Sequence, residues 1–227
     1  MTASIVSLPE LKNRRFVFRD RDHAGEVLGN MIRKDQFENP VLLAIPAGGV
    51  PVAMAAAKQT GFSIDIATVS KITLPWNTEA GYGAVAFDGT MRLNEAMLPH
   101  LHLTEQQISE GIEATRKKVM KRERMLRGED PFPTLSGKTA ILVDDGLASG
   151  FTMFCAIDAV KNAGASQVIV AVPTAPLRTV QAVAAHAERI YCPNIREGGA
   201  FAVADAYENW YDLSDQEIME MLNRPSS

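Results

Sequence analysis

The stretch Thr139-Ala-Ile-Leu-Val-Asp-Asp-Gly-Leu-Ala-Ser-Gly-Phe-Thr152 decides the fold of this chain. Four apolar residues, 140–143, precede two adjacent carboxylates, Asp144 and Asp145. An apolar run of this length suits a strand that is covered on both faces, which is typical of parallel sheets in α/β domains. Ligands of such sheets bind at the carboxyl ends of the strands. The stretch therefore predicts a parallel α/β fold with a binding site directly after residue 143.

The loop behind this acid pair favours a phosphate. Gly146 and Gly150 permit a tight turn and a close approach of the backbone to a ligand. Ser149 and Thr152 add hydroxyl donors, and a helix that follows directs free N–H groups to the same point. Carboxylates do not bind phosphate, so the acid pair is assigned to sugar hydroxyls or to a hydrated divalent cation. Together these residues predict a site for a sugar phosphate with a metal ion.

Helical and extended patterns alternate along the rest of the chain, which is typical of an α/β domain. Thr104 with Gln107, and Ser214 with Glu217, fit capping boxes at helix starts. No repeat and no linker divides the sequence, so residues 1–227 are predicted to form a single domain. The first expected helix starts at Asp20 or Asp22, and the other expected helices are 52–58, 104–127, 152–163, 177–186 and 214–222. The expected strands are 41–45, 64–69, 84–87, 91–93, 140–143, 168–172 and 190–192.

Charge and cysteine content narrow the function classes. The formal net charge is −4, so no general basic field attracts nucleic acid or an anionic membrane. The basic run 117–127 is predicted to be the solvated side of a helix. No apolar run is long enough to span a bilayer, and the N-terminus shows no secretion signal. Two distant cysteines, Cys155 and Cys192, favour a reduced, cytoplasmic protein.

The stretch 139–152 resembles the signature of type I phosphoribosyltransferases for phosphoribosyl pyrophosphate (PRPP). Val41-Leu-Leu-Ala-Ile-Pro-Ala-Gly-Gly-Val-Pro-Val52 resembles the pyrophosphate loop of that family, in which a non-proline cis peptide is common. Residues 71–85 and 192–211 resemble one uncharacterised bacterial and archaeal branch of it. The resemblance covers most of residues 15–222. It implies a parallel sheet flanked by helices, with a small hood made from the terminal segments, about 1–20 and 190–227.

The resemblance also implies a reaction and the residues that serve it. The 5-phosphoribosyl group of PRPP would pass to a nitrogen nucleophile of an unidentified small-molecule acceptor, with release of pyrophosphate. Asp144, Asp145 and Lys71 would be catalytic, and the two aspartates would also be ligands of Mg2+. A homodimer is compatible with the resemblance. The PRPP-binding residues that it implies are Gly146, Leu147, Ala148, Ser149, Gly150, Phe151, Thr152, Ala47, Gly48 and Gly49.

Three positions depart from the pattern of the family. Ala47 stands where a basic residue is common, and Ser70 replaces the arginine of an Arg-Lys pair, so positive charge beside the leaving group is reduced. Ala148 stands where the 6-oxopurine salvage enzymes have an aspartate that handles a proton of the purine. A methyl group neither accepts nor donates a proton, so hypoxanthine and guanine are unexpected acceptors.

Three alternatives stay open. A non-catalytic protein that senses PRPP would keep the phosphate loop but lack turnover, in keeping with Ala47 and Ser70. A phosphoacceptor domain also uses acids at strand ends, but it would need a third acid and a lysine that this sequence does not clearly supply. For Lys71, a solvated surface lysine is nearly as strong an interpretation as a catalytic one.

Overall fold

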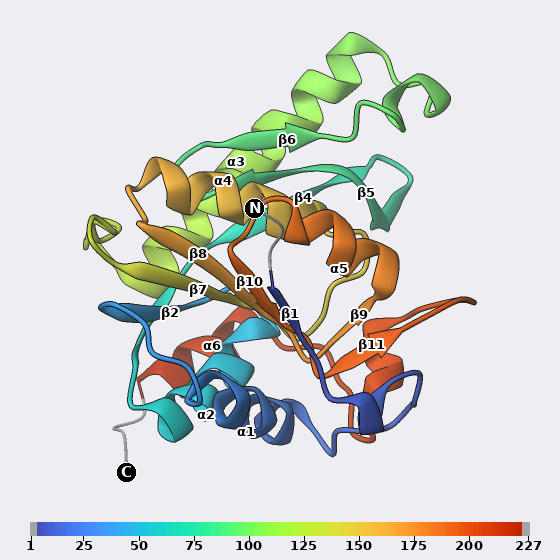
Figure 1. Ribbon diagram of the computed structural model, residues 1–227. Coiled ribbons are helices and arrows are strands. Elements are labelled where there is room, and N and C mark those ends of the chain that lie inside the picture. The colour runs from blue at the N-terminus through green and yellow to red at the C-terminus, as the bar shows by residue number, and fades with distance from the viewer. Residues whose placement is uncertain (1–3, 224–227) are drawn as a thin grey trace.

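A six-stranded parallel sheet forms the centre of the molecule (Figure 1). The structure is a computed structural model that describes residues 4–223, without the side chains of residues 78 and 79. Every neighbouring pair of strands in this sheet is parallel. In spatial order the strands are β1 (Ser4–Val6), β10 (Arg189–Tyr191), β8 (Gln167–Ala171), β7 (Thr139–Val143), β2 (Pro40–Ala44) and β3 (Ser63–Ile66).

Helices cover both faces of the sheet. These helices are α1 (Arg21–Ile32), α2 (Gly49–Thr60), α4 (Phe151–Asn162), α5 (Leu177–Ala184) and α6 (Asp215–Leu222), whereas α3 (Glu105–Arg127) packs on a smaller sheet. On β7, Ala140 and Leu142 pack into a core cluster with α4 and α5, whereas Ile141 and Val143 pack into a second cluster with α1 and α2. All four side chains are fully buried, which confirms a strand covered on both faces. Among residues 4–223, no helix combines the length and the apolar character that a membrane span needs.

Two smaller sheets and three short 3₁₀ turns complete the described chain. An antiparallel sheet of three strands packs with α3 above the main sheet (Figure 1). A parallel pair stands beside the C-terminal part of the chain. The antiparallel strands are β4 (Val69–Leu74), β5 (Asn77–Ala86) and β6 (Met91–Leu93), the parallel pair is β9 (Thr174–Pro176) with β11 (Asn194–Arg196), and the 3₁₀ turns are Pro9–Leu11, Leu98–His100 and Val203–Ala206.

The segment expected to be one strand, 64–69, is divided between two sheets. The amide of Ala67 donates to Ala44 O at 2.9 Å, which is its bond to the main sheet. The chain then turns away, and β4 begins at Val69 in the antiparallel sheet. The prediction of a single strand was therefore wrong, because the apolar pattern runs through the point where the chain leaves the main sheet. The hairpin predicted from 84–87 and 91–93 is confirmed as β5 and β6.

The helix caps follow the sequence closely. Asp20 caps α1 by accepting a hydrogen bond from the backbone N of His23 at 2.8 Å. Both predicted capping boxes are present, at Thr104 for α3 and at Ser214 for α6. These interactions satisfy amides that a helix start would otherwise leave without acceptors.

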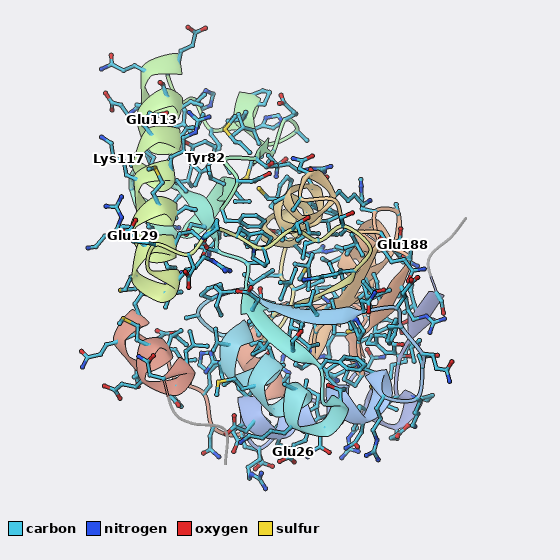
Figure 2. All side chains as sticks on the ribbon, turned by 90° about the vertical axis from the view of Figure 1, so that its left-hand side faces the viewer. Glu26, Tyr82, Glu113, Lys117, Glu129 and Glu188 are labelled. Carbon is cyan, nitrogen blue, oxygen red and sulfur yellow. The ribbon has the colours of Figure 1, made fainter. Side chains whose placement is uncertain are left out.

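The basic run on α3 is only partly a solvated face. Glu113 and Lys117 are exposed and point away from the molecule, whereas Tyr82 of β5 lies on the inner side of the helix (Figure 2). Arg122 and Arg127 are half-buried instead and form ion pairs with Asp215 of α6 and with Asp65 of β3. The prediction for the run was wrong at these two arginines, because they fix α3 to α6 and to the edge of the main sheet.

α1 and α2 approach each other closely through glycines. A Cβ built on Gly25 would overlap the backbone O of Val52 and would lie 2.7 Å from Ala55 Cβ. Gly25→Ala is therefore expected to lower the free energy of unfolding by about 1–3 kcal/mol, because the helices must separate. Chemical denaturation measures the change. Glu26→Ala on the exposed face of the same helix should stay within about 0.5 kcal/mol of the parent. Equal stability of the two variants would contradict the close approach.

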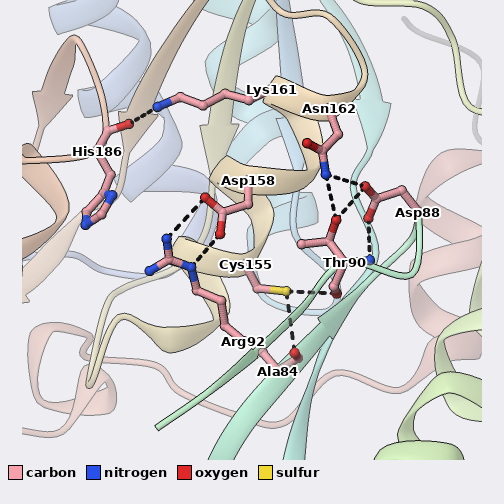
Figure 3. A network of polar contacts seen from close by, with 9 residues as sticks. All are labelled: Ala84, Asp88, Thr90, Arg92, Cys155, Asp158, Lys161, Asn162 and His186. Carbon is pink, nitrogen blue, oxygen red and sulfur yellow. Dashed lines mark hydrogen bonds and ion pairs between the residues drawn. The ribbon is translucent and has the colours of Figure 1, made fainter. Parts of the chain in front are cut away.

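A polar network joins the β5–β6 hairpin to α4 (Figure 3). Arg92 of β6 pairs with Asp158 of α4, and Asn162 donates to Thr90 Oγ1 at 2.9 Å. The Sγ of Cys155 lies 3.2 Å from Thr90 O, so its S–H can donate to that carbonyl. The network holds the hairpin against the helix whose N-terminus follows the phosphate loop.

The Cys155 thiol at the centre of this network is expected to be unreactive. It is fully buried, and burial raises its pKa to about 12, with the nearby acids Asp88 and Asp158 adding to the shift. Because the thiolate is the nucleophile, iodoacetamide at pH 8 should leave Cys155 unmodified in the folded protein, as intact-mass spectrometry would show. Unfolding in guanidinium chloride should expose it to full alkylation. Fast labelling under native conditions would contradict this environment.

Segments from both ends of the chain lie side by side. Phe18 and Tyr207 form an isolated parallel bridge, and their rings are 5.7 Å apart. They form a small apolar cluster with Ala24 and Ala206. The expected hood, about 1–20 and 190–227, extends to residues 1–3 and 224–227, which lie outside the described residues. Its function as a hood stays a prediction.

Candidate functional site

The acid pair directly follows β7 at the carboxyl edge of the main sheet. The backbone N of Asp145 donates to Asp144 Oδ1 at 2.8 Å. Burial raises the pKa of Asp144 well above its usual value, and the negative charge of Asp145 raises it further. Burial also raises the pKa of Asp145, but a guanidinium next to that carboxylate opposes the rise. Two adjacent half-buried acids at this point favour a cation or hydroxyl donors as a ligand.

That guanidinium belongs to Arg21, which the sequence interpretation did not single out. Its Nε donates to Asp145 Oδ2 at 2.9 Å, and its Nη1 donates to Tyr211 O at 2.9 Å. Its Cζ also lies 3.9 Å from the centroid of the Trp210 ring. Arg21 comes 124 positions before Asp145, so no local spacing in the sequence identifies it.

The predicted pyrophosphate loop lies next to the acid pair. It connects β2 to α2 and contains a cis peptide between Pro46 and Ala47, as the resemblance implied. A Cβ on Gly48 would overlap Asp145 Oδ2, so the loop backbone and this carboxylate are in direct contact. In the described part of the chain, the amides of Ala47 and Gly48 have no hydrogen-bond acceptor, whereas Gly49 N donates to Ile45 O. Two amides of the loop are thus available for a ligand.

The predicted phosphate loop has still more free donors. Gly150 has φ 84°, a conformation that glycine adopts without strain, and α4 begins at the next residue. The amides of residues 148–152 have no hydrogen-bond acceptor among the described residues, as expected of a helix start that is open to an anion. Leu147 differs, because its side chain is buried and its amide donates to Thr174 O at 3.0 Å. Leu147 therefore fixes the loop to the neighbouring strand, and its amide is not available to a ligand.

Lys71 lies on the antiparallel sheet rather than on the main sheet. Lys71 is exposed on β4, and the preceding residue, Ser70, is buried on the opposite face of the strand. Its Cβ and Cδ lie 3.3 Å from the position that a Cβ on Gly81 would take. Its catalytic role stays a prediction.

A cation does approach the pyrophosphate loop, although Ala47 is not basic. Arg122 of α3 donates from Nη1 to Pro46 O at 3.4 Å and pairs with Asp215. Arg21 contacts the same Asp145 oxygen that faces Gly48. Both of these guanidinium groups are paired with carboxylates, Arg122 with Asp215 and Arg21 with Asp145.

The donor set around the acid pair fits a metal ion that arrives with its ligand. In the part of the chain that the structure describes, no three His, Cys, Asp or Glu side chains cluster in a way that would hold a metal. Mg2+ commonly uses one or two carboxylates and takes its remaining ligands from water and substrate phosphates. Asp144 and Asp145 fit this mode of binding, and a site preformed entirely by protein groups does not.

A pocket of about 560 Å³ opens beside the phosphate loop. The loop contributes Ala148 and Ser149, and the N-terminal part of α5 contributes Arg178 and Thr179. Thr179 Oγ1 donates to Ala148 O at 2.8 Å, which fixes the wall between loop and helix. The remaining lining residues are Pro176, Ala182, Gly199, Ala200 and Phe201.

An acid pair between two loops with free amides, at the carboxyl edge of a parallel sheet, is typical of α/β proteins that bind a ligand at this edge. Residues 89–206 match the family model of the phosphoribosyl transferase domain, and the chain belongs to this family. The expected fold, a parallel sheet flanked by helices as in type I phosphoribosyltransferases, is confirmed.

Known relatives agree with this assignment. Two curated proteins of Mycobacterium tuberculosis, "Putative phosphoribosyl transferase MT0597" of strain CDC 1551 and "Putative phosphoribosyl transferase Rv0571c" of strain H37Rv, are each 33% identical over 216 residues. The match covers 92% of this chain but only 47% of each relative, so the chain spans about half their length. The crystal structure of TT1426 from Thermus thermophilus is 32% identical, with a TM-score of 0.73, over 90% of this chain and 97% of that one.

Proposed function

We propose that this chain transfers the 5-phosphoribosyl group of PRPP to a nitrogen nucleophile and releases pyrophosphate. The observation that carries the proposal is the contact between the two loops and the acid pair, in which Gly48 abuts Asp145 and free amides lie on either side. PRPP has a monophosphate on C5 and a pyrophosphate on C1 of a ribose with two free hydroxyls. Two anion sites separated by hydroxyl acceptors match that arrangement.

Each group of the site has a defined task in this reaction. The amides of residues 148–152 hold the 5-phosphate, and the amides of Ala47 and Gly48 bind the pyrophosphate. Asp144 and Asp145 accept hydrogen bonds from the ribose hydroxyls and offset the positive charge that develops on the ribose as its C–O bond to pyrophosphate breaks. Bound Mg2+ would neutralise charge on the leaving group. The nucleophile's nitrogen then forms the new bond to the same carbon, and its proton leaves to solvent or to a base that we do not assign.

The pocket beside the phosphate loop is the proposed place for the acceptor. Phe201 supplies an aromatic face for stacking, and Arg178 supplies a cation at the rim. Ala148 offers no proton acceptor there, so we expect an acceptor other than a 6-oxopurine. The buried, unpaired thiols of Cys155 and Cys192 support a cytoplasmic setting for the reaction.

Calorimetry with PRPP and Mg2+ tests the proposal at the level of binding. We expect saturable binding that depends on the metal, and its absence would refute the site. Release of pyrophosphate in the presence of a panel of nitrogen acceptors then tests turnover. Orotate-like acids and heteroaromatic amines belong in the panel, with hypoxanthine as the acceptor expected to fail.

A second candidate function is a PRPP-binding regulator without turnover. The specific observation in its favour is that Arg21 already occupies one oxygen of Asp145. Ser70 and Ala47 also remove charges that would stabilise the leaving group. Binding of PRPP without release of pyrophosphate, across a panel that includes the physiological acceptor class, would favour this alternative.

A further inference from the structure

Arg21 is a buried cation that the proposed reaction does not use. It is 7% exposed, although guanidinium groups are rarely removed from water without compensation. Its compensation comes from one carboxylate, one carbonyl and one aromatic face. All three lie in the candidate site or in the segment 207–211, so the cost of burying this charge is met only where the site is assembled.

Asp145 is held from two sides by groups that pack against one another. Arg21 binds its side chain, and the hydroxyl of Tyr207 donates to its backbone O at 2.6 Å. Tyr207 packs against Trp210 with ring centroids 5.2 Å apart, and Trp210 in turn covers the guanidinium. Residues 207–211 and Arg21 therefore act on Asp145 as one packed unit.

The ion pair also determines which carboxylate oxygen faces which group. Oδ2 of Asp145 receives the Arg21 hydrogen bond and lies directly against Gly48. Arg21 Nε bonds this oxygen while Nη1 bonds Tyr211 O, so the planar guanidinium is fixed at two points and restricts rotation of the carboxylate better than an ammonium would. The arrangement prepares a single orientation of Asp145 before a ligand arrives.

We propose that Arg21 is a positioning residue that orients Asp145 for the ribose and couples occupancy of the acid pair to the segment 207–211. The inference rests on the proposed function in taking PRPP as the ligand. A hydroxyl or a cation that binds Asp145 alters the attraction between that carboxylate and Arg21. The guanidinium is shared with the Trp210 ring, so the change reaches the aromatic segment.

Tryptophan fluorescence makes the coupling visible. The chain has two tryptophans, and Trp76 is exposed, so a Trp76→Phe parent leaves Trp210 as the reporter. The PRPP affinity of this parent is first measured and should equal that of the unmodified protein. We then expect PRPP with Mg2+ to change the fluorescence emission of Trp210. Arg21→Gln should weaken PRPP binding by about tenfold or more and abolish the emission change. Arg21→Lys should recover part of the affinity but little of the emission change, because lysine does not stack as a guanidinium does.

A double-mutant cycle tests whether Arg21 acts through Asp145. In an Asp145→Asn background, Arg21→Gln should add almost nothing to the loss of PRPP affinity. The matched control is Arg189→Gln, which breaks a comparable pair with Asp35 on another part of the surface and should leave PRPP affinity and emission unchanged. Additive losses in the cycle, or a normal emission change in Arg21→Gln, would overturn the inference.

Hydrogen exchange without ligand separates this inference from the proposed function. Arg21→Gln should increase amide exchange in peptides that cover 144–150 and 207–212, and Arg189→Gln should increase neither. If the parent fails to bind PRPP, the proposed function fails while the exchange result still decides the role of Arg21. Exchange in Arg21→Gln equal to that of the parent in both peptides would refute the inference, whatever the ligand is.

Discussion

Replacing Asp144 and Asp145 together by Asn is expected to weaken the binding of PRPP with Mg2+ by about 100-fold or more. The two carboxylates accept charge-assisted hydrogen bonds worth about 1.5–3 kcal/mol each, and neutral amides give up most of that energy. A loss of about 3 kcal/mol corresponds to more than a factor of 100 in the dissociation constant. Isothermal calorimetry with PRPP and Mg2+ measures the change directly.

The control for this variant is its stability. The pKa of Asp144 is raised in the folded protein, so the acid binds its proton more tightly when folded than when unfolded. Its ionised form therefore costs stability at neutral pH, and Asp144→Asn alone should unfold at the same temperature as the parent or higher. Asp130→Asn at an exposed site should change neither property. Normal PRPP affinity in the double variant would remove the acid pair from the site.

Gly48→Ala is expected to reduce the affinity for both pyrophosphate and PRPP by about five- to 100-fold. The new Cβ would overlap Asp145 Oδ2, an oxygen that Arg21 also holds. The carboxylate cannot move away without breaking that ion pair, so the loop must shift and its free amides with it. Overpacking of this kind costs about 1–3 kcal/mol, which sets the expected range.

A glycine elsewhere in the chain provides the comparison for Gly48→Ala. Gly137 has φ 69° and no atom within 4 Å of a built Cβ. Gly137→Ala should therefore lower the melting temperature through backbone strain while pyrophosphate affinity stays at the parent value. If Gly48→Ala lowers stability but leaves affinity unchanged, the loop does not bind pyrophosphate.

The central sheet and the loops of the site follow from local patterns in the sequence. The burial of residues 140–143 on both faces of the sheet needs only an apolar run, and the caps at Thr104 and Ser214 need only side chains at fixed spacing. The position of the loop between β7 and α4 was also predictable, because glycine and hydroxyl residues follow the apolar run directly, whereas its binding of phosphate stays a prediction. These features are decided by residues a few positions apart.

The features that the sequence did not reveal depend on distant partners. The contacts of Arg21 with Asp145 and Trp210 form only in the folded chain, so the sequence around Arg21 does not indicate them. Arg122 and Arg127 share a charge pattern with exposed neighbours, and the approach of α6 and β3 decides that they are half-buried. The strands β9 and β11 have three residues each, too few for a periodic pattern to identify them.

A ribosome releases Ser4–Val6 long before Arg189–Tyr191, yet these two segments are neighbours in the central sheet. The nascent chain therefore presents β1 without its β10 partner until residue 191 has been synthesised. Arg21 is in the same situation, because Tyr211 follows it by 190 positions. Translation order thus makes completion of the ligand site a late event, and a product that stops before residue 189 would carry the acid pair without the contacts that orient it.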